Sequence, residues 1–246
     1  MGLITTMVNT FGGQWFDMDW QPQIDQPGWK EAISFYVELL SEYGPPGASS
    51  NGFNENLALF STGKCGMWVD ATVAAGLLAN PEVSEVSDKV GFAPAPVASY
   101  SNGANWLWTW ALAIPQTSRS PEAAERFITW ATSKEYIQLV AEKSGWVSVP
   151  PGTRISTYEN PEYQAVASFA STVLSSIQAA DVESPAVSPT PYKGIQYVDI
   201  PEFQAIGTQV GQRMAAALTQ KNSVDEALAQ SQRAAERIMR HTGYIE

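Results

Sequence analysis

The stretch "GANWLWTWALAIP", residues 103–115, places tryptophans at three alternate positions, Trp106, Trp108 and Trp110. Because side chains two residues apart share one face of a β-strand, the three indole rings are predicted to line one side of a strand. Leucine or isoleucine would also supply the bulk that a protein core needs. Flat aromatic faces are, in addition, surfaces on which proteins hold sugars and polyols. The stretch therefore has two interpretations, packing in a core and stacking on a sugar-like ligand.

The composition indicates a globular chain and excludes several classes of partner. Of its 246 residues, 44% are hydrophobic and 16% are charged, which suits one large or two smaller domains. A net charge of −11 argues against binding to nucleic acids and to anionic membranes, since both require clustered lysine and arginine. No apolar run approaches the roughly 20 residues that span a bilayer. The opening residues, "MGLITTMVNTFGG", show no signal-peptide pattern.

The residue counts leave little room for catalysis. Cys65 is the single cysteine and His241 the single histidine, so an intrachain disulfide and a metal site rich in these residues are excluded. A hydrolase that uses a histidine base is disfavoured for the same reason. The sequence also lacks the G-x-S-x-G, P-loop, G-x-G-x-x-G and EF-hand motifs. We therefore predict no cofactor and no bound metal.

Hydrophobic periodicity predicts a mixed α/β fold that is rich in helices. Helices are predicted over residues 3–11, 29–40, 55–61, 71–79, 121–131, 134–143, 163–177, 201–218 and 224–238. Strands are predicted over residues 65–70, 90–97 and 106–114, and residues 146–154 are expected to be extended. Because the strands are few and separated by helices, the pattern favours a layered sheet with helices on its faces.

Polar residues stand beside several of the tryptophans. Trp68 and Asp70 lie two apart in a predicted strand and so share one of its faces. Asn105 directly precedes Trp106. A carboxylate or an amide next to an aromatic ring can bind the hydroxyls of a sugar while the ring covers its C–H groups. Arg154, in "VPPGTR", could present a cation to a ligand or stiffen a loop by pairing with a surface carboxylate.

Two carboxylates in "FDMDW" raise an alternative. Asp17 and Asp19 could serve as the acid/base pair that a glycosidase needs. Two acidic residues two apart in a loop also describe a solvated turn. A carbohydrate-active hydrolase domain that uses these residues or Asp70 therefore stays open beside the binding interpretation, as does an interaction module in which the tryptophans form the core.

Longer runs of sequence resemble a known family. The runs "NGFNENLALFSTGKCGMWVDATVAAG", "VGFAPAPV" and "WALAIPQTSRSPEAAERFITWATSKEY" are similar to those of extracellular solute-binding proteins of carbohydrate ABC transporters. More narrowly, "GGQWFDMDW", "WLWTWALAIP", "GWVSVPPGTR" and "GIQYVDIPEFQAIGTQVG" look like the sorbitol/mannitol-binding branch. The order and spacing of these motifs over nearly the whole chain carry the resemblance.

The resemblance implies an α/β fold of the type II periplasmic-binding-protein kind. Members of the family are longer and begin with an N-terminal lobe that follows a signal peptide, so this chain resembles only their C-terminal portion. By the family's pattern, residues 1–104 and 156–246 would form the C-terminal lobe. Residues 105–155 would return to an N-terminal lobe that is mostly absent. With an incomplete cleft, we expect weak or absent binding by this chain alone.

The function that the resemblance implies is transport and not catalysis. The chain would be the substrate-binding component of an ABC importer for sugar alcohols, periplasmic or extracellular, with a polyol or small carbohydrate and the membrane permease subunits as partners. Self-association over an exposed apolar face is a further expectation. The resemblance implicates as ligand-binding residues Trp68, Asp70, Asn105, Trp106, Trp108, Trp146 and Arg154.

Overall fold

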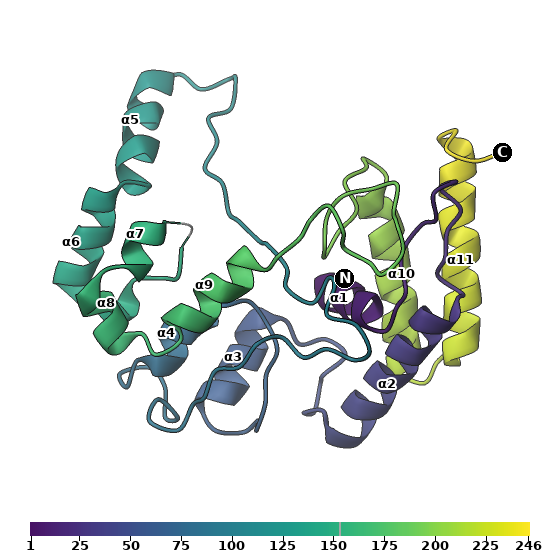
Figure 1. The fold of residues 1–246 in the computed structure, drawn as a ribbon, viewed down its shortest axis with the longest axis horizontal. Coiled ribbons are helices and arrows are strands. Elements are labelled where there is room, and N and C mark those ends of the chain that lie inside the picture. The colour runs from purple at the N-terminus through teal and green to yellow at the C-terminus, as the bar shows by residue number, and fades with distance from the viewer. Residues whose placement is uncertain (153) are drawn as a thin grey trace. The chain divides into compact units, whose positions relative to one another are not determined.

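Helices dominate the structure, a computed structural model in which residues 1–152 and 154–246 are described (Figure 1). The helices are α1 (Gly2–Thr10), α2 (Pro27–Tyr43), α3 (Phe53–Ser61), α4 (Ala74–Ala79), α5 (Pro121–Ala131), α6 (Lys134–Ser144), η1 (Trp146–Ser148), α7 (Ile155–Tyr158), α8 (Pro161–Val166), α9 (Ala170–Gln178), α10 (Phe203–Leu218) and α11 (Val224–His241). In the described part of the chain, no helix is long and apolar enough to cross a membrane.

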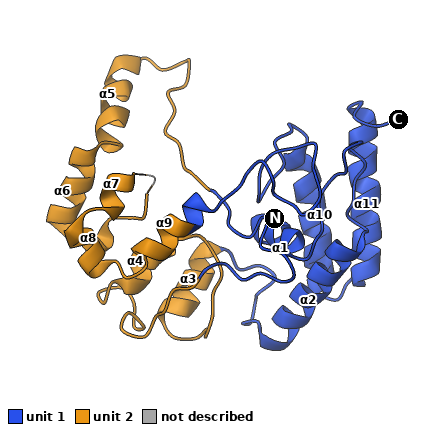
Figure 2. Cartoon of the chain, viewed as in Figure 1, with its two compact units in different colours: residues 1–52, 94–107, 176–246 blue, residues 53–93, 108–175 orange. Residues whose placement is uncertain are grey.

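The chain divides into two compact units, coloured separately in Figure 2. Unit 1 comprises Met1–Gly52, Pro94–Leu107 and Ser176–Glu246. Unit 2 comprises Phe53–Ala93 and Trp108–Ser175. These units describe how the chain packs on itself. Which lobe of a complete binding protein each segment belongs to is a separate question, and the predicted assignment stays a prediction.

Local signals in the sequence explain where several helices begin. At the start of α11, the Ser223 hydroxyl accepts a hydrogen bond from the Glu226 amide at 3.2 Å, and the Glu226 carboxylate accepts one from the Ser223 amide at 2.8 Å. This reciprocal pair confirms the predicted capping box. The Ser133 hydroxyl caps α6 by accepting a hydrogen bond from the amide of Tyr136. Pro121 opens α5 as predicted, although the Ser120 side chain that precedes it accepts no capping hydrogen bond.

One predicted helix is interrupted, and another predicted segment has a different conformation. The helix expected over residues 163–177 is broken between α8 and α9 at Ala167, whose φ of −99° and ψ of 76° are not helical. Phe169, which follows the break, is buried with 1% exposure. The prediction that residues 146–154 are extended is wrong for η1, which is a 3₁₀ turn; Thr153 lies outside the described residues.

The core of unit 1 is aromatic at its centre. Trp15 is fully buried, and its ring meets Trp29 of α2 at 4.7 Å and Phe203 of α10 at 5.0 Å, both edge to face. The Trp15 amide donates a hydrogen bond to the hydroxyl of Tyr192 at 3.1 Å. Around this centre, α1 and α2 pack together and α2 packs against α10 and α11 (Figure 1). The core of unit 1 therefore joins the first helices of the chain to the last.

Unit 2 has a smaller core made mostly of rings. Tyr163 is fully buried and contacts Tyr158 at 6.1 Å and Phe169 at 6.2 Å. Phe169 in turn meets Phe92 at 5.4 Å. Burial raises the pKa of the Tyr163 hydroxyl above its ordinary value, because the phenolate would be poorly solvated there.

The predicted strands are not confirmed. Within residues 1–152 and 154–246, the structure contains no β-strand and has only an isolated antiparallel bridge between Phe16 and Pro22. Residues 65–70, 90–97 and 106–114 are not helical, and in the described chain their amides donate to no backbone carbonyl. A strand forms only where a neighbouring strand accepts its hydrogen bonds, so apolar composition alone did not suffice. The structure itself therefore does not establish the α/β class.

Replacing Trp15 with alanine is expected to lower the free energy of unfolding by about 3–5 kcal/mol, because it empties a large, fully buried site. Trp110→Ala is the control, since the Trp110 side chain is 87% exposed. A surface substitution of this kind changes stability by about 0.5 kcal/mol or less. Urea denaturation followed by far-UV circular dichroism measures both variants. Equal stability of the two would contradict the placement of Trp15 in the core.

Candidate functional site

Trp68 and Asp70 lie in unit 2, between α3 and α4. The Trp68 ring packs against Phe53 at 5.3 Å and Phe60 at 6.1 Å, both on α3. Its indole nitrogen is buried and has no hydrogen-bond partner in the described part of the chain. Asp70 is exposed, and its carboxylate accepts a hydrogen bond from the amide of Ala71 at 2.7 Å. An aromatic face, a free donor and a solvent-facing carboxylate thus stand close together in sequence.

Trp146 opens the η1 turn, also in unit 2. Its indole nitrogen donates to the carboxylate of Glu162 at 3.2 Å, and its ring meets Tyr163 at 6.3 Å. The η1 turn packs against α4, where a methyl group added at Gly76 would lie 2.9 Å from the carbonyl oxygen of Val147. The segment that carries Asp70 leads directly into α4. The turn that carries Trp146 therefore packs on the helix that follows Asp70.

Arg154 is exposed, but its guanidinium is already bound within unit 2. Its Nε and Nη2 atoms donate to the carbonyl oxygen of Thr132 at 3.2 and 2.6 Å. Thr132 is the C-cap residue directly after α5, so the guanidinium binds a carbonyl at a helix C-terminus, where positive charge is favoured. The contact is with a backbone carbonyl, whereas the sequence interpretation named a surface carboxylate, and the ligand-binding role of Arg154 stays a prediction.

Asn105 and Trp106 belong to unit 1, whereas Trp108 belongs to unit 2. Asn105 is half-buried, and the half-buried Trp106 ring lies against Gly2, where an added methyl group would collide with it. Trp108 is 61% exposed and meets the ring of Trp110 edge to face at 5.9 Å. The alternating tryptophans therefore have different surroundings: Trp106 is half-buried beside Gly2, whereas Trp108 and Trp110 are exposed.

The seven predicted ligand residues divide between the units, two in unit 1 and five in unit 2. Among the five in unit 2, all of them described residues, no hydrogen bond, ion pair or ring contact joins any two. Sequence reasoning missed the side chains that surround them, Phe53 and Phe60 beside Trp68 and Glu162 beside Trp146. The spacing of Phe53 and Phe60, seven residues apart on one helix face, was a signal that could have indicated the first pair.

Of the two carboxylates of the hydrolase alternative, that of Asp17 has a structural role. One oxygen of Asp17 accepts from the amides of Asp19 at 3.0 Å and Gln21 at 2.9 Å, and the other accepts from the side chain of Gln23 at 2.9 Å. A carboxylate that binds its own turn in this way holds the loop together. Among the described residues, no group of acidic, histidine and cysteine side chains is arranged to hold a metal ion.

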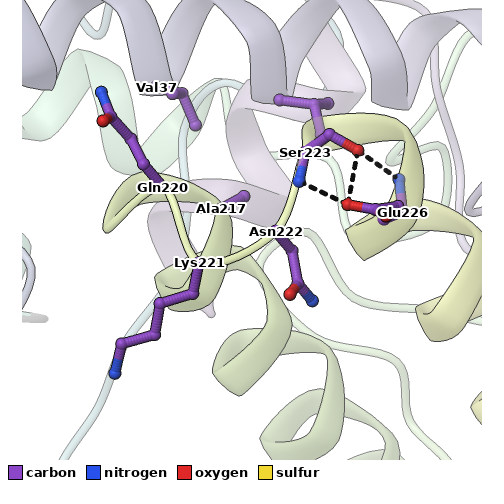
Figure 3. Close-up of a pocket in the computed structure, with 8 residues that line it drawn as sticks. Val37, Ala217, Gln220, Lys221, Asn222, Ser223 and Glu226 are labelled. Carbon is purple, nitrogen blue, oxygen red and sulfur yellow. Dashed lines mark hydrogen bonds between the residues drawn. The ribbon is translucent and has the colours of Figure 1, made fainter.

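A surface depression in unit 1 involves none of the predicted residues. It is lined by Val37 of α2, Ala217 of α10 and the connection into α11, including Lys221 and Asn222 (Figure 3). Its one carboxylate, Glu226, is engaged by the capping box, as the dashed lines in Figure 3 show. Its other polar side chains are those of Gln220, Lys221, Asn222 and Ser223.

Comparison with known proteins identifies the family. Residues 2–138, more than half of the chain, match the family described as bacterial extracellular solute-binding protein. The chain belongs to this family. It is 54% identical over 244 residues to the mannitol-binding protein of Pseudomonas aeruginosa strain PAO1, a match that covers 99% of this chain and 56% of that protein.

Solved structures agree with this membership. An ABC transporter solute-binding protein from Agrobacterium vitis S4, with bound D-mannitol, is 57% identical and superposes with a TM-score of 0.97 over all of this chain and 59% of that one. A solute-binding protein from Agrobacterium radiobacter K84 in complex with ribitol is 24% identical, with a TM-score of 0.78 over 96% of this chain and 55% of that one, and shows the same fold. The solute-binding-protein fold expected from the sequence is confirmed, and the chain spans little more than half the length of these relatives.

The Arg154 contact leads to a prediction for Glu135 at the start of α6. Its own backbone amide and the Ser133 hydroxyl hold the pKa of the Glu135 carboxyl below the ordinary value of 4.5, with the Arg154 guanidinium acting in the same direction. Because this pKa is lowered in the folded state, ionised Glu135 stabilises the folded chain above pH 4.5. That contribution is lost as the pH falls through the lower folded value.

We expect Ser133→Ala to raise the pKa of Glu135 more than Arg154→Met does, because a hydrogen bond to a carboxylate acts more strongly than an exposed charge nearby. Carboxyl NMR titration of Glu135 measures the change in each variant. Arg119→Met removes an exposed arginine elsewhere on unit 2 and should leave the titration unchanged. A Glu135 curve that is identical in wild type and Arg154→Met would place the guanidinium away from the α5–α6 junction.

Proposed function

We propose that the chain forms part of the substrate-binding component of an ABC importer for sugar alcohols, with a hexitol such as D-mannitol as ligand and no catalytic step. The observation that supports this most directly is its 54% identity, over 99% of its length, to a mannitol-binding protein. Its 57% identity and TM-score of 0.97 to a protein solved with D-mannitol support the same ligand class. Because the chain spans only part of the length of these relatives, the binding and transport activity of the complete protein is also a proposal.

The proposed ligand residues would contact different parts of a polyol. Rings of Trp68, Trp106, Trp108 and Trp146 would cover the carbon chain of the ligand. Asp70 and Asn105 would bind its hydroxyls, and Arg154 would do so with those guanidinium nitrogens that the Thr132 carbonyl does not occupy. The exposure of Asp70 and of 61% of Trp108 supports their availability to a ligand. Trp106 and Trp146 also contact other parts of the protein, so these contacts would hold their rings in place for the ligand.

The remaining assignments follow the family's organisation. Residues 1–104 and 156–246 would belong to one lobe of the complete protein and residues 105–155 to the other. The complete protein would act in the periplasm or outside the cell and deliver its polyol to membrane permease subunits. A hydrolase that uses Asp17 and Asp19 is not favoured, since Asp17 is engaged by its own loop.

The ligand is tested by titration of tryptophan fluorescence with D-mannitol, D-sorbitol and maltose. Two proteins are compared, this chain alone and this chain completed with the part of the Agrobacterium vitis protein that it does not span. We expect a saturable change with a hexitol and none with maltose in the completed protein, and a weak or absent change in the chain alone. Saturation by maltose in preference to both hexitols would refute the polyol assignment. Micromolar hexitol affinity of the chain alone would refute the expectation that its cleft is incomplete.

Asp70→Asn in the completed protein should weaken hexitol affinity about tenfold or more, because hydrogen bonds to charged groups contribute about 1.5–3 kcal/mol. The carboxylate is exposed, so the fold should be unaffected. Asp19→Asn is the matched control, an exposed aspartate that should change neither affinity nor stability. Isothermal titration calorimetry measures both variants. If hydrolysis of an aryl glycoside is detected and is lost in Asp19→Asn, the hydrolase alternative replaces the binding proposal.

A further inference from the structure

The two proposed ligand residues of unit 1, Asn105 and Trp106, lie in a segment that forms no helix or strand. This segment is residues 103–107, "GANWL". In the described part of the chain, its amides donate to no backbone carbonyl. A segment without such hydrogen bonds is mobile unless side chains hold it. The contacts that its backbone makes with side chains of unit 1 therefore decide where Asn105 and Trp106 lie.

A buried asparagine binds the start of the segment. Asn9, near the end of α1, is 1% exposed. Its Nδ2 atom donates hydrogen bonds to the carbonyl oxygens of Ile195 at 3.0 Å and Gly103 at 3.4 Å. A primary amide has two N–H groups, so one side chain serves both carbonyls. Removing this amide would leave both carbonyls short of a donor, which is unfavourable where water has little access.

A buried glutamine binds the end of the segment. Gln196 is 6% exposed, and its Nε2 atom donates to the carbonyl oxygen of Leu107. Leu107 is the last residue of this part of unit 1. The residue before Gln196 supplies the carbonyl that Asn9 binds, so the two side-chain amides act through the same loop. Together they fix one backbone carbonyl on each side of the two ligand residues.

Close packing supports the same placement. Gly103 has a φ of +68°, and a methyl group added there would collide with the Pro185 carbonyl and with the Asn9 side chain. Glycine adopts this conformation at little cost, whereas residues with a side chain rarely do. The Trp106 ring lies against Gly2, the first residue of α1, which is the helix that carries Asn9. Helix α1 therefore contacts the segment both at Gly103 and at Trp106.

We infer that Asn9 and Gln196 are positioning residues, which hold Asn105 and Trp106 in the conformation that contacts the ligand. Neither amide binds the polyol itself, since each acts through the backbone carbonyl that it binds. A segment that is already ordered spares the ligand the cost of ordering it, which raises the affinity. The effect on affinity rests on the proposed function. The ordering of the segment does not, and it is measured without a ligand.

The ordering of the segment is measured by fluorine NMR with fluorotryptophan as the label. Both this chain and the completed protein are used, since Asn9, Gln196 and the segment all lie in unit 1. The resonance that disappears in Trp106→Phe is that of Trp106. We expect this resonance to be single and narrow in the wild type and broadened or split in Asn9→Leu and Gln196→Met. Each substitution removes the N–H donors and keeps a side chain of similar size. An unchanged Trp106 resonance in both variants would overturn the inference.

The effect on the ligand is measured by calorimetric titration of the completed protein with D-mannitol. We expect Asn9→Leu and Gln196→Met to weaken the affinity about tenfold or more, because the ligand must then order the segment itself. Unchanged affinity in both variants, beside an altered Trp106 resonance, would overturn the positioning role. If the wild type binds no hexitol, the proposed function fails, and the ligand-free spectra still decide whether the two amides hold the segment.

Gln232→Met is the matched control. The Gln232 Nε2 atom donates to the carbonyl oxygen of Pro22 at 2.7 Å, so this variant also removes a side-chain amide that binds a backbone carbonyl in unit 1. We expect it to lower thermal stability and to change neither the Trp106 resonance nor the affinity for D-mannitol. Equal losses of affinity in Gln232→Met and Gln196→Met would overturn the inference. Should Asn9→Leu not fold, Gln196→Met provides the test by itself, since it removes a single hydrogen bond.

Discussion

The burial of Trp15 is the interaction on which unit 1 depends. Its indole ring contacts one aromatic ring from α2 and one from α10. Its amide donates a hydrogen bond to the hydroxyl of Tyr192, which lies 177 positions later in the chain. Bringing such distant segments together has a loop-closure cost that only substantial apolar burial offsets. Three large rings at one point supply that burial. The cap of α11 and the packing of α2 against it then stabilise a unit whose centre is already fixed.

Elements with local signals were predictable from the sequence, and elements that need distant partners were not. The capping box of Ser223 and Glu226 lies within four residues, and the structure contains it as predicted. The break before Phe169 was not predictable, because the ring is buried against Phe92, far earlier in the chain. The predicted strands failed for a related reason. Their composition is local information, but a strand also requires a neighbour, and the described chain provides none for residues 108–114.

The candidate site divides in the same way. The sequence indicates which residue types suit a polyol, and the family match confirms that they belong to a solute-binding protein. The sequence could not show that the Arg154 guanidinium binds the carbonyl of Thr132 after α5, because the two residues are 22 positions apart. Nor could period-2 alternation reveal that Trp106 packs against Gly2 while Trp108 faces solvent. Residue type thus indicated which side chains could bind a polyol, but not which of them are already engaged by other parts of the protein.

If Trp68 binds the ligand, as we propose, its surroundings give a physical reason for an indole at this position. Between Phe53 and Phe60, a phenylalanine ring would supply comparable aromatic packing and would leave no buried donor without a partner. An unsatisfied buried N–H is unfavourable for the chain by itself. A ligand hydroxyl that reached this nitrogen would remove the penalty only in the bound state. The indole would then favour a hydroxylated ligand over an apolar one of the same shape, which is the discrimination that a polyol-binding protein requires.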